Sequence, residues 1–113
     1  MGACTFSNGI VIKGTMRDAY TQLVEEANAY NGHQDGYSGD IQTSYGFLEP
    51  NTHPKYNTKA FWDWSDKRID NMSKGDCIGI EIKNKAELKK LKGRRWKGKR
   101  GVRAFYFFGL ARC

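Results

Sequence analysis

The segment VRAFYFFGLA, residues 102–111, constrains the fold of this chain more than any other stretch. It reads as a strand in which aromatic rings occupy four successive positions, Phe105 to Phe108. Side chains along a strand point alternately to the two faces of the sheet, so large apolar groups lie on both faces. Such a strand is typically central and covered on both sides. We expect helices to cover one face, and loops or a partner protein to cover the other.

Apolar periodicity predicts a first helix over residues 16–30, where apolar side chains recur at i, i+3, i+4 and i+7 spacing. Thr15 stands at its N-cap, Asp18 suits the dipole of the first turn, and Asn31-Gly32 is expected to end it.

A second helix is expected after a loop that holds both prolines, residues 48–57, with Asn57 or Thr58 as its cap and Lys74-Gly75 at its end. Its apolar face is predicted to hold Phe61, Trp64, Arg68, Ile69 and Met72. A short third helix is predicted within residues 85–91, because Asn84 and Glu87 have capping-box spacing.

Three further segments have strand character. Residues 4–13 are β-rich, and Asn8-Gly9 in the middle marks either a hairpin turn or a bulge. Residues 41–45 alternate apolar and polar side chains, and residues 78–82 alternate isoleucine with other residues.

The order of elements is therefore strand, helix, strand, helix, strand, short helix, strand. It predicts a single α+β domain over residues 1–113, built as a two-layer sandwich. The expected sheet has four to five mostly antiparallel strands, depending on Asn8-Gly9, with two main helices on one face.

The cysteines indicate a reducing compartment. Cys4, Cys77 and Cys113 are odd in number, widely spaced and without a C-x-x-C pair, which argues against a disulfide framework. No signal peptide and no apolar stretch long enough to span a bilayer are read from the sequence. We therefore expect a cytoplasmic protein with no membrane partner; its oligomeric state stays open.

Positive charge is concentrated in the segment KKLKGRRWKGKRG, residues 89–101. The whole chain has 19 Lys and Arg against 12 Asp and Glu, and this segment holds eight of the cations and no acid. A concentrated run makes a local positive field that attracts polyanions. The cations are Lys89, Lys90, Lys92, Arg94, Arg95, Lys97, Lys99 and Arg100.

This segment is the candidate binding element. Its cations would contact phosphates, and Trp96 would stack on an unpaired base, which contributes about 1–3 kcal/mol per base. Two other interpretations stay open: Trp96 folds back onto the core, or the cations meet an acidic protein surface, including a host complex that handles nucleic acid.

An enzymatic alternative rests on Glu81 and Lys83, which alternation places on one face of the isoleucine strand. They resemble the E-x-K half of the PD-(D/E)xK nuclease family, in which the carboxylate binds a divalent metal and the lysine helps to activate water. That family implies a further acid, here Asp40 or Asp76, but the chain has no Pro-Asp pair. A cross-strand ion pair explains the same pattern.

The turn GHQDGYSGD, residues 32–40, is the place for a third alternative, the binding of a small nucleotide. His33 and His53 lie 20 residues apart without metal-ligand spacing, so we expect neither a metal nor another cofactor.

Two segments, YNGHQDGYSGDIQTS (residues 30–44) and FYFFGLARC (residues 105–113), resemble small proteins carried by bacteriophages and other mobile elements. In those proteins a tyrosine-glycine-histidine stretch precedes a Y-x-G-x-I-x-T strand, and the chain closes on an F-F-G-x-A strand. The resemblance implies a compact, non-enzymatic phage-type protein. Such proteins often bind host machinery, so we expect an antagonist of a host-defence complex such as a CRISPR effector.

Overall fold

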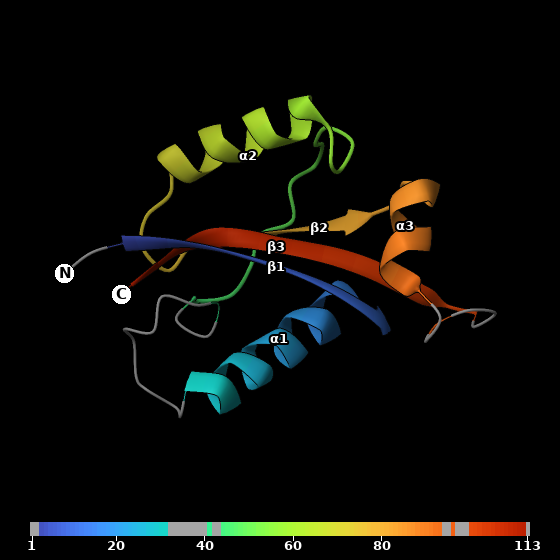
Figure 1. Cartoon of the computed structure of the whole chain (residues 1–113). Helices are drawn as coiled ribbons and strands as arrows, with labels where there is room; N and C mark the ends of the chain where they lie inside the picture. The colour runs from blue at the N-terminus through green and yellow to red at the C-terminus, as the bar shows by residue number, and fades with distance from the viewer. Residues whose placement is uncertain (1–2, 32–40, 42–43, 94–95, 97–99, 113) are drawn as a thin grey trace.

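The computed structural model describes residues 3–31, 41, 44–93, 96 and 100–112 of the chain. Within these residues the fold is α+β, as expected, with one three-stranded antiparallel sheet and three helices (Figure 1). In chain order the elements are β1 (Ala3–Lys13), α1 (Met16–Asn31), α2 (Lys59–Asp70), β2 (Cys77–Ile82), α3 (Lys85–Lys92) and β3 (Val102–Arg112).

The aromatic strand is central, as its sequence predicts. The sheet order is β1-β3-β2, and β3 pairs antiparallel with both neighbours. β1 pairs residue for residue with β3 from Ala3 opposite Arg112 to Lys13 opposite Val102. Asn8-Gly9 therefore forms neither a hairpin nor a bulge, and residues 3–13 are one strand.

The two main helices lie on opposite faces of the sheet, so the expected two-layer arrangement is wrong. Figure 1 shows the sheet as a middle layer between α2 and α1. Phe105 and Phe107 join the core that α1 covers, whereas Tyr106 and Phe108 join the core that α2 covers. Because both faces of β3 hold large rings, each face needs its own helix; burying one such ring contributes about 1.5–3 kcal/mol. The second cover is thus part of this chain.

The sheet has fewer strands than expected because the predicted strand at residues 41–45 is absent from the described part of that segment; residues 42–43 lie outside it. Pairing occurs further along, where Leu48 makes an isolated parallel bridge to Ile78. The Leu48 N–H donates to the Cys77 carbonyl at 2.9 Å, and the Gly79 N–H donates to the Leu48 carbonyl at 3.0 Å. Pro50 follows two residues later and has no N–H to extend a ladder.

The first two helices begin where the sequence predicts. Thr15 and Asp18 form a reciprocal capping box: Asp18 N–H donates to Thr15 Oγ1 (3.2 Å) and Thr15 N–H to Asp18 Oδ2 (2.9 Å). The hydrogen bond from the Thr15 N–H is the largest cause that lowers the pKa of the Asp18 carboxyl. At α2, the Thr58 hydroxyl accepts from the Phe61 N–H at 3.2 Å.

The third helix forms without the predicted capping box. Asn84 occupies the N-cap, but its side chain caps nothing and instead donates to the Tyr56 carbonyl at 2.7 Å. The Glu87 carboxylate accepts from the Asn57 amide at 3.2 Å. Both side chains therefore fasten α3 to the loop that leads into α2.

The cysteines differ from expectation. Cys77 is free and buried, and burial raises the pKa of its thiol to about 12. Cys4, however, is disulfide-bonded, and Cys113 lies outside the described residues. The cysteine pattern therefore no longer supports a reducing compartment.

Candidate functional site

The fold brings three strand ends and one helix together at one end of the sheet. β1 ends at Lys13, β2 ends at Ile82, and β3 starts at Val102. Because β3 is antiparallel to both neighbours, its start lies beside their ends, and Figure 1 shows α3 at this same end. We call this region the basic end.

Exposed cations from several segments gather at the basic end. Lys13 comes from β1, Lys83 and Lys85 flank the N-cap of α3, and Arg100 precedes β3. From the segment predicted as the binding element, the structure describes Lys89, Lys90 and Lys92 in the last turn of α3, together with Trp96 and Arg100. The predicted contacts Arg94, Arg95, Lys97 and Lys99 lie outside the described residues.

Two acids at the basic end are already engaged by other groups. Glu87 Oε1 lies 3.8 Å from Lys90 Nζ and also accepts from Asn57. Glu81 is bound by both guanidinium branches of Arg103, with Nε at 3.0 Å from Oε2 and Nη2 at 2.8 Å from Oε1. The lysines of the last turn of α3 are well placed for the negative end of the helix dipole. Among the described residues of the basic end, exposed cations therefore outnumber acids.

Trp96 lies against the fold and is half-buried. It lines a hollow of about 350 Å³ together with residues of β1 and α1, among them Val11, Asp18 and Gln22. Of the two interpretations of this indole, the geometry favours packing on the fold, with only part of the ring left for a partner.

The nuclease candidates do not form one metal site. Glu81 is held by Arg103, whose hydrogen bonds are the largest cause that lowers the pKa of that carboxyl. Asp76 lies at the other end of β2, and five residue steps of extended chain separate it from Glu81 by about 17 Å. Lys83 is exposed, and Asp40 lies outside the described residues. In the part of the chain that the structure describes, no three His, Cys, Asp or Glu side chains are grouped to hold a metal ion.

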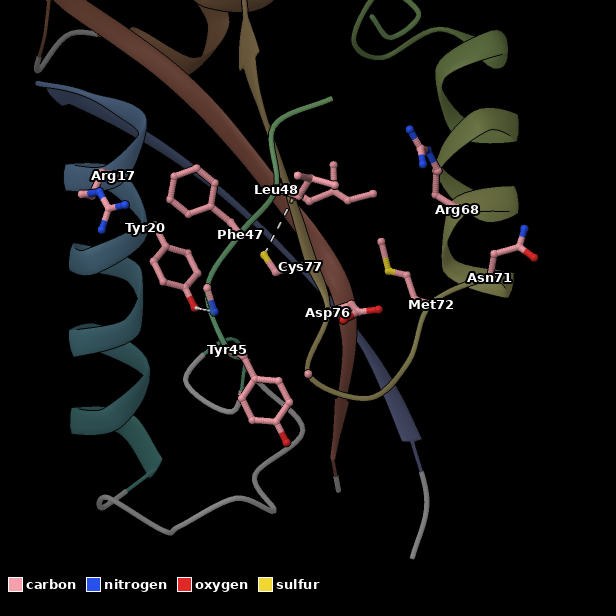
Figure 2. A pocket seen from close by; sticks show the side chains of 13 residues that line it. Arg17, Tyr20, Tyr45, Phe47, Leu48, Arg68, Asn71, Met72, Asp76 and Cys77 are labelled. Atoms are coloured by element: carbon pink, nitrogen blue, oxygen red, sulfur yellow. Dashed lines mark hydrogen bonds between the residues drawn. The ribbon is translucent and has the colours of Figure 1, made fainter. Parts of the chain in front are cut away.

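A separate groove of about 640 Å³ lies along the outer side of β2, and the sequence gives no sign of it. In Figure 2, α1 forms one wall with Arg17 and Tyr20, and α2 with the turn that follows it forms the other with Arg68 and Met72. The segment from Tyr45 to Leu48 runs between the two walls.

The groove exposes apolar side chains on an anchored segment. Tyr45 is 73% exposed and Leu48 is 64% exposed. The Tyr20 hydroxyl anchors the segment through two hydrogen bonds. One joins it to the Ser44 hydroxyl, and in the other it accepts from the Gly46 N–H at 3.1 Å. The groove is assembled from a loop and two distant helices, which explains why no local sequence pattern reveals it.

The turn proposed for a small nucleotide, residues 32–40, lies outside the described residues. His53 lies elsewhere, and its Nδ1 is 2.8 Å from the Pro54 carbonyl oxygen.

Comparison with known proteins gives no match: no protein-family model, no curated protein and no solved structure is significantly similar to this chain. Within the described residues, none of the helices has the length and apolar character needed to cross a membrane.

Proposed function

We propose that this protein is a non-enzymatic binding module that contacts nucleic-acid phosphates with its basic end. The observation that supports this most is the convergence of exposed cations from β1, the β2–α3 turn, α3 and the start of β3 on one end of the sheet. Phosphate contacts of this kind supply most of non-specific nucleic-acid affinity.

The charge distribution favours a polyanion over a single small anion. Lys89 and Lys90 are exposed on α3, whereas Lys13 and Arg100 come from the ends of separate strands. Cations spread over several elements match a ligand with repeated charges along its length. If six of them meet duplex phosphates, log K falls with log salt at a slope of about −5.

The resemblance to phage-type proteins suggests where the bound nucleic acid would come from. The bound nucleic acid would belong to a host complex, such as a CRISPR effector, and binding would interfere with host defence. An acidic protein surface of such a complex offers similar electrostatics and is the competing partner.

A paired charge reversal tests the proposal. Lys89→Glu with Arg100→Glu alters the basic end, whereas Lys67→Glu with Lys74→Glu makes the same change in net charge near the far end of α2. Binding to single-stranded and duplex DNA and RNA is measured by gel shift across a salt series, with and without magnesium. We expect the first variant to bind about tenfold more weakly or worse, and to show a shallower salt slope. The second variant should bind like the unmodified protein.

Melting followed by circular dichroism serves as the folding control, since these side chains are exposed and both variants should stay folded at the temperature of the binding assay. Equal binding by both variants would contradict the proposal. If the unmodified protein binds none of these nucleic acids at low salt, the basic end is expected to bind an acidic protein surface instead.

A further inference from the structure

In the described sheet β1 is an edge strand, and its own sequence has little of the usual protection against pairing. Among the described residues, no strand lies on its outer side, whereas the outer side of β2 is partly covered by Leu48. Proteins guard such edges with charges, prolines or bulges. From Ala3 to Ile12 the strand has no charged residue and no proline, and its register with β3 is uninterrupted.

On the side of the sheet where α2 packs, much of β1 is exposed, and this exposed surface leaves room for a further strand beside β1. Thr5, Ser7 and Gly9 share this face and are exposed, whereas Phe6 and Ile12, on the opposite face, are buried against α1. A strand added at the edge would meet small side chains on one face and continue the apolar layer on the other.

The strand is complementary to itself. In an antiparallel pair of identical strands, a two-fold axis at Asn8 sets Phe6 opposite Ile10 of the second copy and Thr5 opposite Val11. These are apolar and β-branched pairs of the kind that stabilise neighbouring strands. No like charges face each other, and all eleven residues of β1 overlap.

We propose that β1 is the interface of a homodimer, in which two copies pair antiparallel through this edge and their sheets merge into one of six strands. The interface is isologous, as most homodimer interfaces are. The main-chain groups of the edge supply the hydrogen bonds, and the half-buried Ile10 side chains supply apolar contact beside the axis.

Sedimentation equilibrium without nucleic acid measures the association directly. We expect the unmodified protein to sediment at twice the monomer mass of 12.9 kDa. Thr5→Lys with Gly9→Lys should sediment as a monomer, because it places charges on the pairing edge. A lysine fits at Gly9, where the nearest atom to an added Cβ is the Phe105 carbonyl oxygen at 3.9 Å.

The matched control is Thr21→Lys with Thr52→Lys, which adds the same charge at exposed positions on α1 and a loop, and should remain a dimer. A monomeric unmodified protein would overturn the proposal, and so would a Thr5→Lys, Gly9→Lys variant that stays dimeric. Neither result bears on nucleic-acid binding, which is measured separately.

A cross-link decides the matter if the lysine variant does not fold. Directly opposed residues in antiparallel strands have Cα atoms about 4.5–5.5 Å apart, within the range of a disulfide. Asn8→Cys, oxidised with copper phenanthroline, should form a covalent dimer on a non-reducing gel. Thr21→Cys and the unmodified protein are the controls. No cross-link above these controls rejects the predicted register.

Discussion

At the scale of single residues, Gly109 fixes how closely β3 approaches its neighbours. It lies opposite Phe6 of β1 and Cys77 of β2. A Cβ at this position would lie 2.8 Å from Phe6 Cζ and 3.0 Å from Cys77 Cα, and the Asp76 carbonyl oxygen is closer still. The absent side chain is therefore what lets the strands and Phe6 pack here.

Gly109→Ala is predicted to destabilise the protein by about 1–3 kcal/mol, because the added methyl group meets main-chain atoms that cannot move aside. Urea unfolding followed by circular dichroism measures the change. Gly9→Ala is the comparison, since nothing lies within 3.9 Å of its added Cβ and the loss of chain entropy on folding becomes smaller. Equal stability of the two variants would show that the contact at Gly109 relaxes freely.

At the scale of elements, Arg103 connects three segments at the basic end. It extends from β3 to Glu81 of β2, and its Nη1 donates to the Gly14 carbonyl of the β1–α1 turn at 3.3 Å. The Glu81 side chain is 21% exposed and that of Arg103 is 43% exposed, so solvent screens the pair. We expect the pair to contribute at most about 1 kcal/mol.

The pH dependence of this contribution follows from the lowered pKa of Glu81. A carboxyl whose pKa is lower in the folded state stabilises the fold above its unfolded pKa, about 4.3, and loses that effect as pH falls through the folded value. Glu81→Gln should therefore reduce stability at pH 7, and the difference from the unmodified protein should shrink when the pH is lowered to well below the unfolded pKa. Urea unfolding at both pH values checks this, with Glu25→Gln on α1 as the control. A constant difference between the two pH values would contradict it.

The elements also show how far the sequence predicts this fold. α1 and α2 were predicted because periodicity and caps such as Thr15 and Thr58 are local signals. The position of β3 was predicted because its rings occupy both faces. Periodicity shows which side of a helix is buried but not which face of the sheet it covers, so the placement of both helices on one face was wrong.

The candidate site, like the fold, could be predicted from the sequence only in part. The cations of residues 89–101 are a contiguous run that the sequence shows directly, whereas Lys13 and Lys83 join them only through the antiparallel topology. Asp76 was predicted to lie near Glu81 because the two are close in sequence. Five residue steps of extended strand, however, place them about 17 Å apart. The groove around Tyr45 and Leu48 depends on tertiary contacts alone.

At the scale of the whole molecule, the proposed pairing of β1 fixes how far apart the two basic ends of a dimer lie. The basic end lies at the carboxyl end of β1, and the proposed dimer pairs β1 antiparallel with its copy. The two basic ends therefore lie at opposite ends of the paired strands, about 33 Å apart for ten residue steps of extended chain. This is close to one helical turn of duplex DNA, about 34–36 Å.

If both proposals hold, one dimer contacts one duplex at two places a helical turn apart. A duplex of about 24 base pairs accommodates both basic ends, whereas one of about 10 base pairs accommodates one, so the unmodified protein should show roughly twice the salt slope on the longer duplex. Fluorescence anisotropy with both duplexes across a salt series measures the slopes. The Thr5→Lys, Gly9→Lys variant gives the baseline for duplex length itself, and Thr21→Lys with Thr52→Lys accounts for the added charge. If the ratio of slopes is the same for dimer and monomer, the two basic ends do not share a duplex, even where each proposal holds separately.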